Sequence, residues 1–84
     1  MNEMKLRKKI KSMIKSGKDL SIIKWREEDS SGYCGDISYI LKKFSNNLYN
    51  LFYNDYKDNH EVFINQIIIR IEEKNIFIED YKTE

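Results

Sequence analysis

Residue types suited to nucleophilic or metal chemistry are scarce, because the 84-residue chain contains one cysteine, Cys34, and one histidine, His60. Cys34 lies in the segment Gly-Tyr-Cys-Gly at 32–35, and a glycine-flanked turn can expose a thiol. A reactive thiol also needs a base or a positive neighbourhood, whereas most of the charged residues near Cys34 in the sequence are acidic. We therefore interpret Cys34 as a structural or incidental cysteine.

A metal site is not indicated either. Zinc in proteins takes several His or Cys ligands at characteristic spacings, and Cys34 is the one other such residue that His60 could recruit. We interpret His60, within the polar segment 58–61, as a solvent-exposed side chain. The sequence predicts no metal and no cofactor.

Carboxylates occur in three clusters, at 27–29, 72–73 and 79–80. Paired carboxylates can supply a general acid and a general base, but these clusters adjoin polar turns or strand ends and are typical of solvated charge. The three glycines match no phosphate-binding spacing. We expect a protein that is not an enzyme.

Charge is distributed unevenly along the chain. Residues 1–26 contain nine Lys or Arg against two acids, whereas the remaining residues contain six against twelve. Such asymmetry can steer and orient partners, although the two ends could also neutralise each other in the fold. Cations of the N-terminal segment could contact nucleic-acid phosphates; these candidates are Lys5, Arg7, Lys8, Lys9, Lys11 and Lys15.

Tyrosines and acids gather in the second half of the chain. Tyrosine is enriched in protein–protein hot spots because it brings a large contact area at low entropic cost. Acidic groups beside it would complement a basic protein target and speed association. The predicted partner-binding residues are Tyr49, Tyr53, Asp55, Tyr56 and Asp58, with Glu72, Glu73, Glu79 and Asp80 as an acidic edge.

The elements that would position these groups follow from hydrophobic spacing. Apolar residues recur every three or four positions from Leu6 to Ile14, which predicts an amphipathic helix over 3–16. The Ile- and Trp-containing segment 20–27 predicts a short strand, and the polar segment 28–35 predicts a loop.

The central segment carries the longest helical pattern. Asp36 suits a helix N-cap, and Asn46-Asn47 could divide the helix into two. Apolar side chains recur at a period near 3.6 behind that cap; they are Ile37, Ile40, Leu41, Phe44, Leu48, Leu51 and Phe52.

Residues 60–72 fit both a helix and a strand. A polar interruption at 72–75 separates two isoleucine-rich runs and favours a β-hairpin in which 66–72 pair with 76–81. The predicted fold is α+β: an N-terminal amphipathic helix, a short strand, a long central helix, and a C-terminal hairpin forming a small antiparallel sheet. The whole chain, 1–84, is expected to be a single domain.

Composition bounds the cellular setting. Hydrophobic residues make up 40% and aromatic residues 13% of the chain, which is typical of a folded protein. No apolar run is long enough for a membrane span or a signal peptide, and one cysteine cannot form an internal disulfide. We expect a cytoplasmic protein. The absence of Ala and Pro beside abundant Lys, Ile and Asn indicates an AT-rich genome, of a low-GC bacterium or its phage or plasmid.

These observations leave two main functional hypotheses. The first is a protein-binding module, an inhibitor, immunity or anti-defence protein that blocks a larger partner such as a nuclease. The second is a small winged-helix-like nucleic-acid-binding protein that uses its basic N-terminal helix. A structural or oligomerisation subunit is a third possibility, and the sequence predicts neither an oligomeric state nor the partner's identity.

Overall fold

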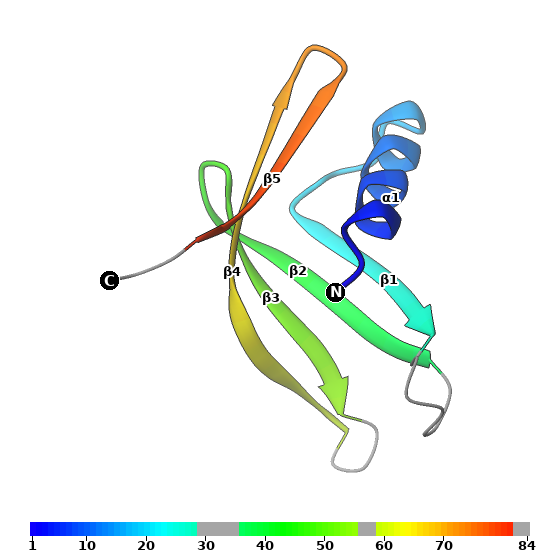
Figure 1. The fold of residues 1–84 in the computed structure, drawn as a ribbon, viewed down its shortest axis with the longest axis vertical. Coiled ribbons are helices and arrows are strands. Elements are labelled where there is room, and N and C mark those ends of the chain that lie inside the picture. The colour runs from blue at the N-terminus through cyan, green and yellow to red at the C-terminus, as the bar shows by residue number, and fades with distance from the viewer. Residues whose placement is uncertain (29–35, 56–58, 82–84) are drawn as a thin grey trace.

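The computed structural model describes residues 1–28, 36–55 and 59–81. Within them the chain forms one helix followed by five strands (Figure 1). The elements are α1 (Glu3–Lys15), β1 (Ile22–Glu28), β2 (Asp36–Ser45), β3 (Leu48–Asp55), β4 (His60–Glu72) and β5 (Asn75–Tyr81). The protein is therefore mostly β, and the expected α+β fold with a long central helix is wrong.

The central segment forms β2 and β3 rather than a helix. The supposed breaker Asn46-Asn47 is the turn between these strands, and Asn47 has a left-handed φ of 65° that asparagine tolerates better than most residues. Both faces of β2 and β3 carry apolar side chains, so alternation with period two is masked and a helical stripe can be traced through the same residues. Pairing with neighbouring strands then decides the structure, since local propensity is only a weak preference.

The five strands form one antiparallel sheet in the order β1-β2-β3-β4-β5, each strand pairing with the next along the chain. Residues 66–72 do face 75–81 across the last pair. These two strands, however, are the end of a five-stranded meander and not a separate small sheet, and residues 60–72 are all strand. The winged-helix arrangement is excluded, because it required helices where β2 and β3 lie.

The N-terminal helix lies where its pattern predicts it. The Asn2 side chain caps α1 by accepting a hydrogen bond from the Met4 backbone N–H at 3.0 Å. Gly17, at φ +69°, closes the helix, and the Lys18 N–H donates to the Met13 carbonyl at 2.9 Å. Among the described residues, α1 is the one helix, and it is too short and too charged to cross a bilayer.

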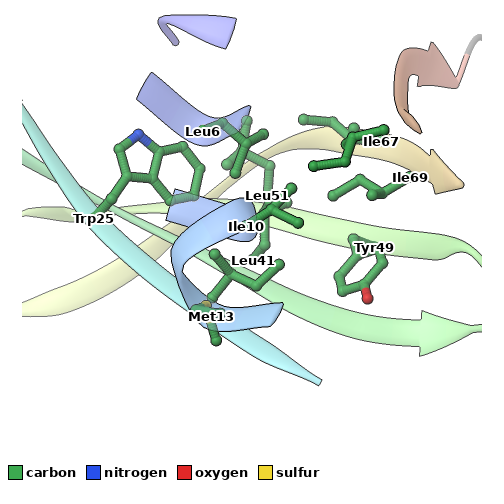
Figure 2. Packing of buried hydrophobic residues seen from close by; sticks show 11 residues of the cluster. Leu6, Ile10, Met13, Trp25, Leu41, Tyr49, Leu51, Ile67 and Ile69 are labelled. Carbon is green, nitrogen blue, oxygen red and sulfur yellow. The ribbon is translucent and has the colours of Figure 1, made fainter. Parts of the chain in front are cut away.

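The helix packs against one face of the curled sheet, which we name the inner face; the opposite one is the outer face (Figure 1). Register shifts interrupt the β2–β3 pairing between Lys43 and Ser45 and the β3–β4 pairing between Leu51 and Phe52, and such irregularities bend and twist a sheet. Figure 2 shows how side chains from α1 and from the strands meet between the two layers. The core consists of Leu6, Ile10, Met13, Ile23, Trp25, Leu41, Tyr49, Leu51, Ile67, Ile69 and Ile76.

Candidate protein-docking surface

The outer face of the sheet carries apolar side chains that no other element of the described chain covers. In β1, buried residues alternate with exposed ones, so Ile22 and Lys24 point away from the helix. Register places Lys24 opposite Ile40, Ile40 opposite Phe52, and Phe52 opposite Phe63. One continuous row therefore crosses four strands on the outer face.

Aromatic contacts organise this row. The rings of Phe52 and Phe63 meet edge to face, with centroids 5.7 Å apart. The Lys42 ammonium lies 5.2 Å from the centroid of Phe52 and forms an ion pair with Glu61 at 2.6 Å. Ile22 pairs with Lys42 and extends the apolar surface to the edge strand. We name this surface the outer patch, formed by Ile22, Ile40, Phe52 and Phe63.

Exposure distinguishes the outer patch from a core. Ile22 is 50% exposed and Phe63 is 54% exposed, while Ile40 and Phe52, on the two strands between them, are half-buried. Single exposed apolar residues are ordinary on a protein surface, but contiguous apolar clusters rimmed by polar groups mark interaction sites. Here the rim is polar: Lys42, Asn50 and Gln66 follow one another across β2, β3 and β4 beside the apolar row, with Gln66 donating to Asn50 at 2.9 Å, and Lys24 lies at the β1 end of that row.

A second exposed ring lies further along the sheet. Phe77 of β5 is 38% exposed, and the Arg70 guanidinium lies 5.2 Å from its centroid. Arg70 also lies 3.5 Å from Glu72 and 3.7 Å from Glu79. Its charge is thus balanced by two carboxylates, and this end of the outer face is not strongly basic.

Of the tyrosines predicted to bind a partner, the two that the structure describes, Tyr49 and Tyr53, lie on the inner side of β3. Tyr49 is 4% exposed and belongs to the core, and its hydroxyl donates to the Leu20 carbonyl at 3.0 Å. Tyr53 is half-buried and pairs with Tyr39 on the inner side of β3. The Asp55 backbone ends β3, and Tyr56 and Asp58 lie outside the described residues.

The predicted acidic edge is divided. Glu72 and Glu73 lie at the β4–β5 turn, whereas Glu79 and Asp80 lie towards the far end of β5. Arg70 neutralises part of this charge, since it contacts both Glu72 and Glu79. Asp80 pairs with Ile67, a core residue, and therefore faces the inner side. Four acids close in sequence do not form one acidic surface.

The basic candidates all lie on α1. Arg7 is half-buried and donates from its guanidinium to the Ile76 carbonyl, which ties the helix to β5. Lys9 is also half-buried, whereas the other four lysines are exposed. In the part of the chain that the structure describes, none of these lysines forms an ion pair.

Titratable groups with altered pKa flank the start of β1. The Ser21 backbone and hydroxyl donate to the Asp19 carboxylate at 3.0 and 2.9 Å, and these hydrogen bonds lower the pKa of Asp19. Burial raises the pKa of the Tyr49 phenol, and the charge of Asp19 adds to that effect. Both groups serve local structure, the first a turn and the second the core.

No grouping of metal-ligating side chains occurs among the residues described by the structure. His60 is exposed at the first position of β4. Cys34 lies outside the described residues. Glu27, although 8% exposed, accepts hydrogen bonds from Trp25 Nε1 at 3.2 Å and from the Asn2 backbone, so it stabilises the packing of α1 on β1.

Sequence reasoning missed the outer patch because it assigned Ile40 and Phe52 to a helix core. A signal was present in the consecutive apolar pairs Ile22-Ile23, Ile40-Leu41 and Leu51-Phe52. Neighbours in a strand point to opposite faces, so each pair must expose one member unless both faces are covered. The chain matches no protein-family model, and no curated protein or solved structure is detectably similar to it.

Proposed function

We propose that this protein is a non-enzymatic binding module that holds a larger protein against its outer patch. One observation carries the proposal: Ile22 and Phe63 are each half or more exposed on the uncovered face of the sheet, Phe63 at the end of the row that starts at Lys24 and Ile22 beside its β1 end. Burying such a row against a partner releases water from apolar surface, which favours association. Lys24 and Lys42 at its rim would select partners bearing carboxylates there.

We further propose that binding inhibits or neutralises the partner, as an immunity or anti-defence protein does. A small sheet with an apolar centre and a polar rim is well suited to cover a site on a larger molecule. The composition supports a setting in the cytoplasm of a low-GC bacterium or of a cell infected by its phage. The acidic, tyrosine-rich surface is not retained, since Tyr49 is buried and the acids are dispersed.

The test is an affinity capture from lysate of a low-GC host, with nuclease treatment and moderate salt before mass spectrometry. The double variant I22S/F63S should lose a stoichiometric protein partner, with affinity reduced at least about tenfold, because hot spots dominate interface energy. Met4→Ser is the matched control, since Met4 is 68% exposed but lies on α1. A partner retained equally by all three proteins would show that the outer patch is not the docking surface.

Nucleic-acid binding by α1 is a second candidate, favoured by its exposed lysines. Phosphate contacts of this kind weaken steeply as salt rises. The same capture distinguishes the two, because nucleic acid would be lost after nuclease treatment, and its retention would be insensitive to I22S/F63S.

A further inference from the structure

A groove separates the C-terminal half of α1 from the tip of the β4–β5 hairpin. Figure 1 shows the hairpin tip beside the last turns of the helix. The groove has a volume of about 360 Å³, and its apolar lining comes from Ile14 of α1, Ile71 of β4 and Ile76 of β5. Ile14 is 45% exposed and Ile71 is 39% exposed, so apolar surface on both walls faces solvent.

Charge around the groove has a definite sign. Lys11 and Lys15 line the helix wall, and Lys74 lines the hairpin wall, against one acid, Glu73. All four side chains are exposed, and none of them forms an ion pair within the described residues. The groove thus presents isoleucines framed by three ammonium groups and one carboxylate.

One hydrogen bond and a shared core connect the two walls of the groove. Arg7 donates to the Ile76 carbonyl, which joins α1 directly to β5. Ile76 itself is 6% exposed and packs in the core with Ile10 and Met13. A groove that exists before binding loses less entropy when it is filled.

We propose that this groove binds an acidic amphipathic helix of a partner protein. Apolar side chains spaced one turn apart on such a helix would insert between Ile14 and Ile71, the usual way a helix occupies a groove. Carboxylates flanking them would meet Lys11, Lys15 and Lys74, so charge complementarity selects an acidic occupant. The proposal does not depend on the outer patch, because the two surfaces share no residue.

Other anionic occupants fit the lining less well. Single-stranded nucleic acid is held by stacking on aromatic rings, and the groove residues are aliphatic and charged. A membrane surface fits less well because the apolar lining has no Trp or Phe of the kind that anchors at lipid interfaces.

The probe is a fluorescein-labelled helical peptide with leucines on one face and glutamates beside them. Two matched peptides carry lysine for glutamate, or serine for leucine. Binding is measured by fluorescence anisotropy with the full chain, and the site is mapped by amide chemical shifts in ¹H–¹⁵N spectra. We expect saturable binding of the acidic amphipathic peptide alone, with shifts centred on Ile14, Ile71 and Lys74.

Charge variants locate the interaction. K11E/K15E should weaken binding roughly fivefold to twentyfold, and E73K should strengthen it about twofold to fivefold, as expected for exposed ion pairs. R26E/K43E is the matched control, with the same change in net charge at exposed positions outside the groove, and should change affinity by less than about twofold. Thermal unfolding of each variant verifies that it is folded.

Several results would overturn the proposal. One is equal affinity for the acidic and basic peptides, and another is a set of shifts centred on the outer patch. A third is binding of a labelled oligonucleotide or of phosphatidylglycerol vesicles that K11E/K15E abolishes while the peptide does not bind. The last is no saturable peptide binding up to about 1 mM, beyond which an interaction is too weak to be specific.

Discussion

The two faces of the sheet differ in how their apolar side chains are used. On the inner face, Ile10 is fully buried among side chains from every strand, whereas on the outer face Ile22 is 50% exposed with no element above it. Packing against α1 is thus the source of the fold's stability. Apolar residues on the outer face contribute little to that packing, which makes them informative about binding.

The largest expected effect on stability comes from one isoleucine-to-alanine substitution on each side of the sheet. Ile10→Ala should lower the free energy of unfolding by about 2–5 kcal/mol, because buried methyl and methylene groups are removed and a cavity remains. Ile22→Ala should cost no more than about 1 kcal/mol, the range of strand propensity at an exposed position. Urea unfolding followed by circular dichroism measures both.

Equal losses of unfolding free energy in Ile10→Ala and Ile22→Ala would contradict the distinction between a packed inner face and an uncovered outer face. They would mean that the outer face is covered in the folded protein, for example by a second copy. Sedimentation of both variants and of the unaltered chain is the control for that outcome.

Substituting one glutamate on each face should have smaller effects on the free energy of unfolding. Glu27 on the inner face receives the Trp25 Nε1–H and the Asn2 N–H, while Glu61 on the outer face pairs with exposed Lys42. Glu27→Ala leaves the buried Trp25 Nε1–H without its acceptor and should destabilise the protein by about 1–3 kcal/mol. Glu61→Ala should cost about 0–1 kcal/mol, with a difference that shrinks in high salt.

The measurement is urea unfolding of both glutamate variants at low and high salt. A larger loss for Glu61→Ala than for Glu27→Ala would contradict the assignment of structural contacts to the inner face. Glu27→Gln is the control, since its amide oxygen can still accept one of the two hydrogen bonds.

The parts of the fold that could be predicted from the sequence are those whose signals are local. Helix α1 is local: its apolar residues follow one spacing, its cap residue Asn2 is adjacent, and Gly17 ends it. Its prediction needed no knowledge of distant residues. The β4–β5 pairing was similarly accessible, because a two-residue turn lies directly between the strands.

The central hairpin was not readable in this way. A sheet whose outer face is apolar places large side chains at consecutive positions, such as Ile40-Leu41 and Leu51-Phe52, and these also fit a helical stripe. The outer patch depends on register across four strands, from Lys24 to Phe63, which no local pattern specifies. Tyr49 was wrongly predicted to lie at the surface for the same reason, because the pairing of β3 with its neighbours determines that this side chain faces the core.

The smallest predicted effect concerns the one tyrosine that Figure 2 labels in the core. Tyr49→Phe removes the hydrogen bond to the Leu20 carbonyl and should lower stability by about 0.5–1.5 kcal/mol near neutral pH. Burial, followed by the charge of Asp19, raises the pKa of Tyr49 above the ordinary value of 10.0 in the folded chain. The unfolded chain therefore releases this proton first as pH rises.

Stability supplied by the Tyr49 phenol is thus fully present below pH 10.0 and declines as pH rises from that value towards the raised folded pKa. All other residues are the same in both proteins, so the difference between the unaltered chain and Tyr49→Phe isolates this group. Urea unfolding at a series of alkaline pH values should show the difference in unfolding free energy between the two proteins narrowing as pH rises. A gap that stays constant through this range would mean that Tyr49 meets solvent as freely in the folded as in the unfolded chain. The inner face would then be open to water, and the contrast with the outer face would fail at the residue that tests it most directly.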